Sequence, residues 1–275
     1  MQEDWGLILK ARISSLICPI HRFGRNARVH SVFENSFNIE GGGQLINVTN
    51  FPEYLSSFGI SLPDDIFQQI FPYVQQGNIV KIRENQFTFY SHKGVVTLSV
   101  EDADIVTLNI STITLENQKL QPLQDILKSK RLELLIGLEM NDQAKYIFSL
   151  MTSSKISIEQ WQEVITYLIG RGKGLTPSGD DIITTYLSVL RVRGDSRAEV
   201  LSSVLAHSPL ATTDISKAYI LGAIQGYVNS FVFQLFSDLA TEQIQAQIQK
   251  SVDKLMYIGH SSGKDMCFGL LLGLQ

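Results

Sequence analysis

The sequence predicts an α+β protein, in which a β-rich N-terminal unit (a small barrel or sandwich) precedes a helical C-terminal bundle. Between residues 28 and 110, short β-branched and aromatic runs alternate with Gly, Asn, Asp or Ser turns, a pattern typical of short strands. From residues 115–122 onward, apolar residues recur at helical spacing instead. The chain has 275 residues, 44% of them hydrophobic, which suffices for one large domain or two ordinary ones. We expect a β-rich domain at residues 1–115 and an α-helical domain at residues 116–275.

Charge and cysteine content exclude several classes of protein. The net charge is -4 and the pI is about 5.7, without basic runs, so nothing favours binding to nucleic acid or to a membrane surface. Cys18 and Cys267 are too few for a disulfide framework or a cysteine zinc site. No uncharged apolar run approaches the roughly 20 residues that span a bilayer, and the acidic N-terminus does not resemble a signal peptide. We expect a cytoplasmic protein without a nucleic-acid or membrane partner.

The β-rich unit begins after a segment whose pattern decides little. Residues 6–18 fit either a helix or a strand, and a small basic cluster follows them. We favour a solvated loop for this cluster, with an anion-facing edge as the sharper alternative. The cluster consists of His21, Arg22, Arg25, Arg28 and His30.

The strands themselves are short and separated by turns. Pro63 stands near the start of a single expected helix, at residues 63–73. The triple glycine at residues 41–43 is interpreted as a turn or bulge, with close approach to a ligand as the alternative. The β-forming residues between Val29 and Ile39 and the apolar run 45–48 fit strands, and the further candidates are residues 77–83, 86–90, 94–100 and 105–110.

The C-terminal half reads as a series of amphipathic helices. Gly170 is placed to stop one of them, and Ser196 with Glu199 forms a capping-box pair at the start of another. Gly222 and Gly226 lie inside one long helical pattern, which indicates close helix crossing or close approach to a ligand. The expected helices are residues 122–130, 141–151, 157–169, 182–194, one from residue 196, 214–239, 241–256 and 263–275.

A glycine-rich turn at residues 170–181 reads G-R-G-K-G-L-T-P-S-G-D-D. We expect a new helix to begin at Thr176 or Ser178, with Thr176 as N-cap and Pro177 in the first helical position. Free backbone N–H groups at this helix start would bind an anion, and Lys173 would add a positive charge. The spacing fits neither a Walker loop nor a dinucleotide-binding fingerprint.

Two aspartates complicate a simple phosphate loop. Asp180 and Asp181 fall in the first helical turn, where carboxylates interact with the positive end of the helix dipole. Three interpretations remain open. The aspartates cap the helix, or they hold a divalent cation that bridges to phosphate, or one accepts a hydrogen bond from the substrate while the glycine amides hold its anionic end.

A second turn, G-H-S-S-G-K-D at residues 259–265, repeats the pattern. Both turns contain S-G-x-D before an apolar helix, so we expect them to face each other across a cleft, with Asp181 and Asp265 as counterparts. His260 would supply an acid–base group and Lys264 a cation. The plainer interpretation makes His260 a turn residue that caps the preceding helix.

A third candidate segment, A-T-T-D-I-S-K, occupies residues 211–217. Helix capping by Thr213, Asp214 or Ser216 is the favoured interpretation. The alternative places these hydroxyls and Lys217 along the same cleft. The chain shows no Ser-His-Asp set, no G-x-S-x-G elbow and no H-E-x-x-H motif, so no metal ligands are assigned.

The candidate site therefore combines all three segments. The candidates for catalysis are His260, Asp181 and Asp265. A divalent cation at Asp180 and Asp181 is the cofactor left open. The candidates for substrate binding are Gly172, Lys173, Gly174, Thr176, Ser178, Gly179, Asp180, Thr213, Ser216, Lys217, Ser261, Ser262, Gly263 and Lys264.

At these motifs the chain resembles the AllH-type family. The resemblance rests on G-L-T-P-S-G-D-D, on T-T-D-I-S-K-A, on the closing I-G-H-S-S-G-K-D-M-C-F-G-L-L-L-G-L, and on R-V-H-S-V-F-E-N-S-F-N-I near the start. It covers nearly the whole chain, and the first motif is the most specific.

The resemblance implies a subunit of the oxamate carbamoyltransferase of purine-derived allantoin breakdown. That activity converts oxalurate and phosphate to oxamate and carbamoyl phosphate and requires AllF- and AllG-type partner subunits. The ligand would be phosphate, carbamoyl phosphate or a carboxylate. Because the S-T-R-T-R loop of ordinary transcarbamoylases is missing, carbamoyl transfer would use a different site. The alternatives are a non-catalytic ligand-binding or scaffold subunit, and a phosphotransferase that uses ATP and Mg²⁺.

Overall fold

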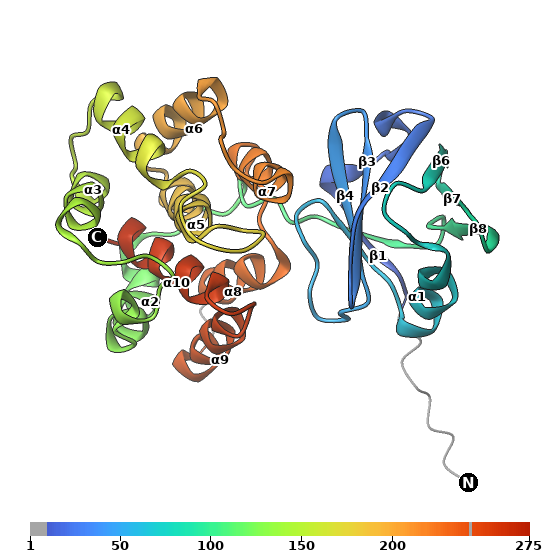
Figure 1. Cartoon of the computed structure of the whole chain (residues 1–275). Coiled ribbons are helices and arrows are strands. Elements are labelled where there is room, and N and C mark those ends of the chain that lie inside the picture. The colour runs from blue at the N-terminus through green and yellow to red at the C-terminus, as the bar shows by residue number, and fades with distance from the viewer. Residues whose placement is uncertain (1–9, 242–243) are drawn as a thin grey trace, which may run out of the picture. The chain divides into compact units, whose positions relative to one another are not determined.

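The computed structural model describes residues 10–241 and 244–275 (Figure 1). The chain divides into two compact units, Met1–Leu108 and Asn109–Gln275. The acidic N-terminus, the first part of the undecided segment 6–18 and residues 242–243 of the expected helix 241–256 lie outside the described residues. Within the described ranges, no helix is both long enough and apolar enough to cross a membrane.

The N-terminal unit is built on one curled, nine-stranded sheet with the order β8-β7-β6-β2-β3-β4-β5-β1-β9. Neighbouring strands pair antiparallel, except for the parallel pairs β4–β5 and β1–β9. The strands are β1 (Arg12–Ser14), β2 (Asn26–Phe33), β3 (Ser36–Gly41), β4 (Gln44–Thr49), β5 (Gly59–Ser61), β6 (Ile79–Arg83), β7 (Gln86–Ser91), β8 (Gly94–Ser99) and β9 (Asp104–Val106). Short helical elements are η1 (Ser15–Ile17), η2 (Ile20–Phe23), α1 (Asp64–Ile70) and η3 (Phe71–Tyr73).

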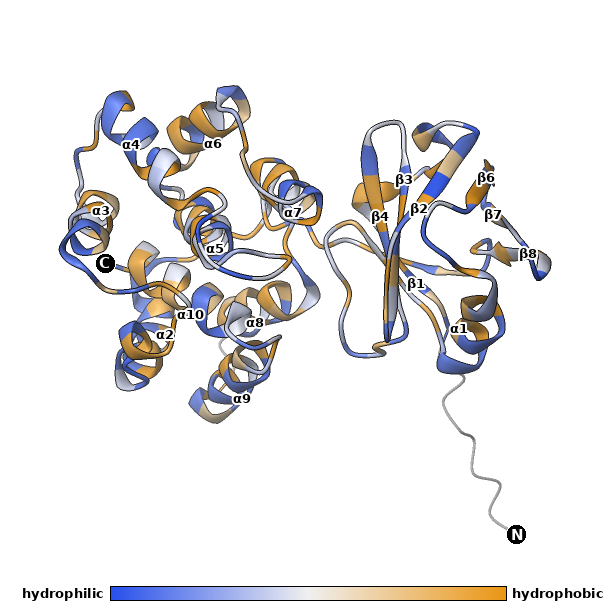
Figure 2. Cartoon of the chain, viewed as in Figure 1, coloured by the Kyte–Doolittle hydropathy of each residue, from blue (hydrophilic) through white to orange (hydrophobic). Residues whose placement is uncertain are grey.

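Buried and exposed side chains alternate along the strands, so one face of this sheet lies in a core. Phe87 and Phe89 of β7 are fully buried, and the ring of Phe37 from β3 meets that of Phe89 edge-on, with centroids 5.7 Å apart. Phe67 of α1 packs on the same cluster, 5.9 Å from the Phe37 ring. In Figure 2 the strands change between hydrophobic and hydrophilic colours along their length. This is the half-buried sheet that the β-branched and aromatic runs predict.

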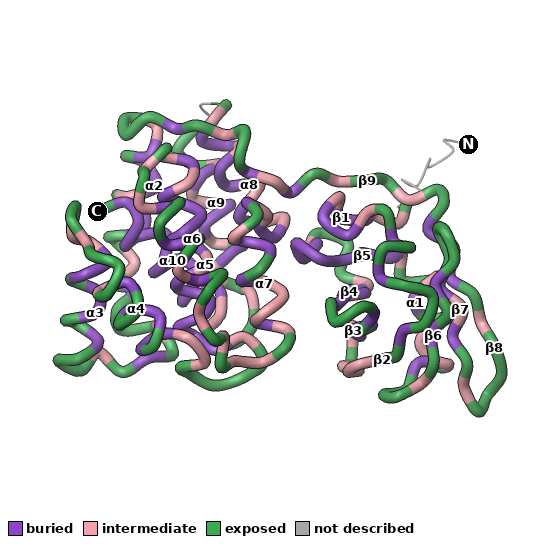
Figure 3. The backbone as a smooth tube through the Cα atoms, turned by 90° about the horizontal axis from the view of Figure 1, so that it is seen from above, coloured by how far each residue is buried: buried purple, intermediate pink, exposed green. Residues whose placement is uncertain are grey.

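The C-terminal unit is helical, as predicted. Its elements are α2 (Asn117–Ser129), η4 (Leu132–Leu134), α3 (Asp142–Thr152), α4 (Ile158–Leu168), α5 (Ser178–Val192), α6 (Arg197–His207), α7 (Asp214–Ile224), α8 (Ser230–Ala240), α9 (Gln245–Met256) and α10 (Ser262–Gly273). All of α5 is buried except Thr184 and Arg191, and all of α10 except Ser262 and Lys264. Both helices run through the purple, buried part of this unit in Figure 3. The other helices surround this central pair.

Glycines in α10 permit the close crossing with α5. A Cβ atom at Gly269 would lie 2.2 Å from the carbonyl oxygen of Ile182 and 2.3 Å from Thr185 Oγ1. At Gly273 it would lie 2.8 Å from Val189 Cβ. The Thr185 hydroxyl donates to the Met266 carbonyl oxygen at 2.9 Å, which adds a polar link between the two helices. The close contact brings the first turns of α5 and α10 together.

Two expectations about the helices were wrong. The pattern at residues 214–239 forms α7 and α8, because the chain turns at Gly226 with φ +84° and Asn229 caps α8 through its side chain. The Gly226 carbonyl oxygen accepts a hydrogen bond from the Ile110 amide at 2.8 Å, which holds this break. Ser196 makes no capping hydrogen bond. The expected strand 105–110 was too long, since β9 ends at Val106.

The contact at Gly269 gives a test, because helix propensity and packing predict opposite changes in stability when this glycine is replaced by alanine. Gly269→Ala should raise stability by about 1 kcal/mol from propensity alone, but the added Cβ collides with α5. We expect the free energy of unfolding to fall by roughly 1–3 kcal/mol, as measured by urea unfolding. Ser203→Ala at an exposed position of α6 is the control and should leave stability unchanged or slightly higher. A stabilised Gly269→Ala variant would contradict the close crossing.

Candidate functional site

The two glycine turns form matching helix–turn–helix units. In both, the glycine of S-G-x-D packs against the end of the preceding helix. A Cβ at Gly179 would lie 2.1 Å from the Leu168 carbonyl oxygen, and a Cβ at Gly263 would lie 2.1 Å from that of Leu255. The amide of Gly179 donates to Arg171 O at 2.9 Å, and that of Gly263 donates to Ile258 O at 3.0 Å. Only glycine fits either position, so both helices start at fixed points.

Direct contacts join the two turns, as the repeated motif predicts. The hydroxyls of Thr176 and Ser262 are hydrogen-bonded at 2.9 Å. Gly137, in the loop after η4, lies between the turns and donates its amide to Asp265 Oδ1 at 2.8 Å. A Cβ at Gly137 would lie 2.2 Å from Ser178 Oγ and 3.0 Å from Ser261 Oγ. Three stretches of chain therefore meet at the first turns of α5 and α10.

The start of α5 differs from one expectation. The helix begins at Ser178, one of the two predicted positions, but Pro177 occupies the N-cap position and no side chain caps the helix. Thr176 is not the N-cap, because its hydroxyl bonds to Ser262 instead. The expected stop at Gly170 is confirmed, with φ +73°.

Asp180 fastens the glycine-rich turn to the segment before α7. Its Oδ1 accepts from the Gly170 amide at 2.8 Å. Its Oδ2 accepts from Ser216 Oγ at 2.6 Å and from the Thr212 hydroxyl. The residue is 1% exposed. Because donors bond to both carboxylate oxygens, Asp180 is a structural crosslink.

The third segment supports the same crosslink. Thr213 caps α7 by accepting from the Ser216 amide at 3.0 Å, which confirms the capping interpretation. Its hydroxyl also donates to the Leu175 carbonyl oxygen at 2.5 Å. Lys217 forms an exposed pair with Asp214 at 3.2 Å. The hydroxyls of this segment therefore bond to the glycine-rich turn at residues 170–181, whereas the ammonium of Lys217 pairs with Asp214.

Asp181 and Asp265 form a buried pair of carboxyl groups. They are 3% and 0% exposed, and the Oδ2 atom of each has no hydrogen-bond partner among residues 10–241 and 244–275. Burial raises the pKa of Asp181 well above its ordinary value, the hydroxyls of Ser262 and Thr176 lower it, and nearby Asp265 raises it further. Burial also raises the pKa of Asp265, against the lowering effect of the Gly137 amide. Burial and the neighbouring carboxyl group therefore both favour the protonated form of Asp181.

Backbone donors lie directly before this pair. Gly172 and Gly174 have φ values of +124° and +92°, so the loop at residues 172–176 takes a conformation that other residues rarely adopt. Its amides donate to no other group in the described part of the chain. Lys173 is exposed in the same loop. Consecutive free amides ahead of a helix N-terminus suit an anion.

The remaining candidates of the second turn are less constrained. His260 is exposed, and its ring makes no hydrogen bond within the described ranges, so it does not cap α9. The Lys264 ammonium donates to the His260 carbonyl oxygen. No group of three or more His, Cys, Asp or Glu side chains that could hold a metal occurs in the described part of the chain.

Two contributors were not predicted from the sequence. Gly137 stands 33 residues before the start of the glycine-rich turn and carries no motif of its own. Thr212 lies inside the third segment, yet only its neighbours were singled out. The doublet Thr212-Thr213 was the available signal, because one hydroxyl caps α7 and the other bonds to Asp180.

Two family models match the chain. The model described as the AllH family N-terminal domain matches residues 10–120. The model described as oxamate carbamoyltransferase subunit AllH matches residues 168–274, a range that contains all three segments of the candidate site. No solved structure matches the chain.

The crosslink at Asp180 predicts a large stability effect. Asp180→Asn replaces the carboxylate with a neutral amide, so the Gly170 amide and the two hydroxyls would lose the carboxylate to which they now donate. Because hydrogen bonds to charged groups contribute about 1.5–3 kcal/mol, we expect the free energy of unfolding to fall by roughly 3 kcal/mol in urea titrations. Asp142→Asn removes the same charge from the first turn of α3, where the side chain is fully exposed, and should change stability by less than about 0.5 kcal/mol. Equal effects of the two changes would refute the crosslink.

The raised pKa of Asp181 predicts how stability depends on pH. The folded state holds the Asp181 proton at pH values where the unfolded chain has released it, so the free energy of unfolding falls as the pH rises from about 4, the ordinary carboxyl value, through the raised value. Asp181→Asn removes this loss. The variant should therefore gain stability relative to the parent as the pH is raised from about 4 to about 8 in parallel urea titrations. Parallel pH profiles for the parent and the variant would contradict the buried-proton assignment, and Asp142→Asn again serves as the control.

Proposed function

This chain belongs to the AllH family, a subunit family of oxamate carbamoyltransferase, and on this premise we propose that its paired glycine turns bind the anionic substrate of a carbamoyl transfer. The substrate would be oxalurate with phosphate, and the products would be oxamate and carbamoyl phosphate. The proposal includes a cytoplasmic location and a role in the breakdown of purine-derived allantoin.

The observation that carries this proposal is the buried pair Asp181 and Asp265 beside the free amides of residues 172–176. Oxalurate has a carboxylate at one end and a ureido group, rich in N–H donors, at the other. The loop amides suit the carboxylate or the phosphate. The unpartnered Oδ2 atoms of the two aspartates suit the ureido end. One site thus offers both kinds of group that the substrate needs.

The same pair suits the proton movement of the reaction. A phosphate oxygen attacks the carbamoyl carbon, the bond from that carbon to the oxamate nitrogen breaks, and that nitrogen takes up a proton. The proton lost by hydrogen phosphate balances this uptake, so the reaction needs a group that relays one proton. Asp181, whose pKa burial raises well above its ordinary value, would act as that relay. His260, an exposed residue, would contact ligand only at the outer end of the site.

The sequence left open a divalent cation at Asp180 and Asp181, but the structure of this site gives that possibility little support. Three hydrogen bonds already engage the two oxygens of Asp180, and Asp181 with Asp265 would offer only two carboxylates to an ion that usually takes several more oxygen ligands. The function proposed for the paired turns therefore does not depend on a metal.

A non-catalytic role is the second candidate, and exposed apolar residues near the turns favour it. Leu175 is 49% exposed, and Tyr257, just before the second turn, is 88% exposed. As a subunit of a multi-subunit enzyme, the chain has other subunits as partners. AllF- and AllG-type subunits would cover these side chains, and the chemistry would then belong to a partner while this chain holds ligand or scaffold.

The test is phosphate-dependent carbamoyl transfer by the assembled enzyme. Asp181→Asn should lower the rate by roughly 100-fold or more, since general acid–base groups contribute about 10²–10⁴-fold, while the variant still folds and co-purifies with its partners. Asp142→Asn should retain the parental rate. An unchanged rate for Asp181→Asn would remove Asp181 from the mechanism. Full transfer by the partners without this chain would assign it to the scaffold role.

A further inference from the structure

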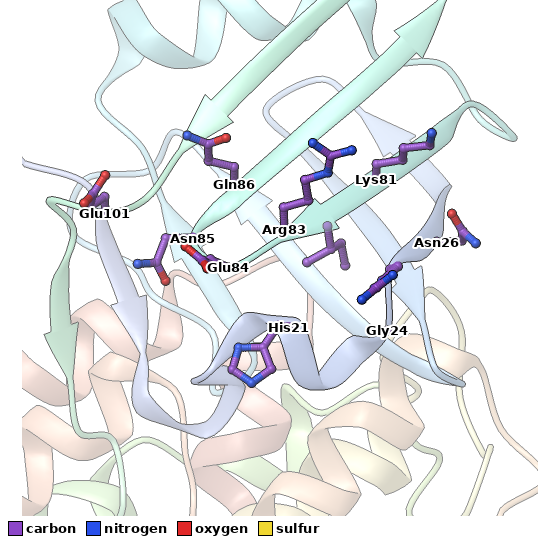
Figure 4. Close-up of a pocket in the computed structure, with 11 residues that line it drawn as sticks. His21, Gly24, Asn26, Lys81, Arg83, Glu84, Asn85, Gln86 and Glu101 are labelled. Atoms are coloured by element: carbon purple, nitrogen blue, oxygen red, sulfur yellow. The ribbon is translucent and has the colours of Figure 1, made fainter.

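A separate cavity of about 900 Å³ lies wholly within the N-terminal unit. It opens between η2 with its following residues and the β6–β7 hairpin (Figure 4). Its volume falls in the range of about 300–1,000 Å³ that is usual for small-molecule sites. Part of the basic cluster near residues 21–30 lines it, so this feature of the sequence has a place in the fold that the paired turns do not use.

The backbone around this cavity is held by the sheet. Asn26 of β2 pairs with Lys81 of β6, and the amide of Ile82 donates to the Arg25 carbonyl oxygen at 3.0 Å. Gly24 has φ +84°, which lets the chain turn from η2 into β2. On the other wall, Glu84 in the tight β6–β7 turn has φ +41°, an uncommon conformation for a non-glycine residue. The walls of the cavity are therefore fixed elements.

Three cations line the cavity, namely Arg25 just before β2, and Lys81 and Arg83 of β6. Lys81 and Arg83 alternate with the buried Val80 and Ile82, so both point from the same face of β6. None of the three forms an ion pair with a carboxylate in residues 10–241 or 244–275, although Lys81 lies 5.5 Å from the Tyr90 ring centroid. Like charges that line one cavity repel each other, and a bound anion would relieve that repulsion.

Two carboxylates also line the cavity. Figure 4 shows Glu84 and Glu101 apart from Lys81, with Asn85 beside the two acids. We propose that this cavity binds a small phosphorylated or carboxylated metabolite whose anion meets Arg25, Lys81 and Arg83 and whose other end presents an amino or hydroxyl donor to Glu84 and Glu101. The two acids disfavour a nucleic-acid backbone, which is anionic along its whole length.

The proposal does not rest on the function assigned to the paired turns, because every residue that lines the cavity belongs to the other unit. Carbamoyl transfer and ligand binding in the N-terminal unit are therefore measured separately, and either result stands without the other.

The test uses calorimetric titration of the full chain with three probes. Ethyl phosphate presents only the anion, phosphoethanolamine adds an ammonium donor, and malonate replaces phosphate with carboxylates. We expect phosphoethanolamine to bind more tightly than ethyl phosphate, and Arg83→Ala to weaken both by about tenfold. Lys81→Ala is a second variant with the same expectation. The matched control is Lys93→Ala, an exposed cation in the β7–β8 turn outside the cavity, which should leave both affinities unchanged.

The two carboxylates have a variant of their own. Glu101→Gln should abolish the preference for phosphoethanolamine over ethyl phosphate and leave ethyl phosphate affinity the same or slightly higher. Tighter binding of malonate than of ethyl phosphate would assign the site to carboxylates within the proposed class. Absence of binding by all three probes would overturn the proposal, as would equal weakening by Arg83→Ala and Lys93→Ala.

Discussion

The C-terminal unit depends on the close approach of the first turns of α5 and α10, because that contact buries Asp181 and Asp265 together. Transfer of a carboxylate out of water costs several kcal/mol, whereas a helix N-terminus returns only about 0.3–1 kcal/mol. Burial therefore dominates and raises the pKa of both carboxyl groups. The approach is possible because α10 has glycine at positions 269 and 273, where a side chain would collide with α5, while Gly179 and Gly263 let each helix start close against the helix before it. The glycines of the motif are thus explained by packing as well as by any ligand.

Two adjacent aspartates in one helical turn perform opposite tasks. Asp180 faces the segment before α7, and donors satisfy both of its oxygens. Asp181 faces α10 and keeps an oxygen without a donor. This division resolves the conflict between an anion-binding loop and carboxylates in the same turn. One negative charge is held by donors on the far side, and the other is neutralised by a proton, so the amides of residues 172–176 remain favourable for an anion.

The sequence predicted the fold class and the meeting of the two turns, because periodicity and the repeated S-G-x-D pattern are local signals. It did not predict Gly137, since a contact across more than 120 residues to Asp265 leaves no local trace. The break between α7 and α8 was missed because Gly226 fits the helical pattern of the sequence. Only the structure shows that its carbonyl oxygen accepts a hydrogen bond from the distant Ile110 amide. The sequence also did not predict that the aspartates are buried, because acidic residues in the first turn of a helix are ordinarily exposed. Tertiary packing decides these features.

The central claim is that Asp181 carries a proton at neutral pH inside the folded protein. Infrared difference spectroscopy between the parent and Asp181→Asn measures this directly, because a protonated carboxyl has a C=O stretch that a carboxylate lacks. The account predicts a protonated-carboxyl band in the parent at pH 7, its loss in Asp181→Asn, and its retention in Asp142→Asn. A parent spectrum without that band at pH 7 would contradict the account, since both carboxyls of the pair would then be ionised.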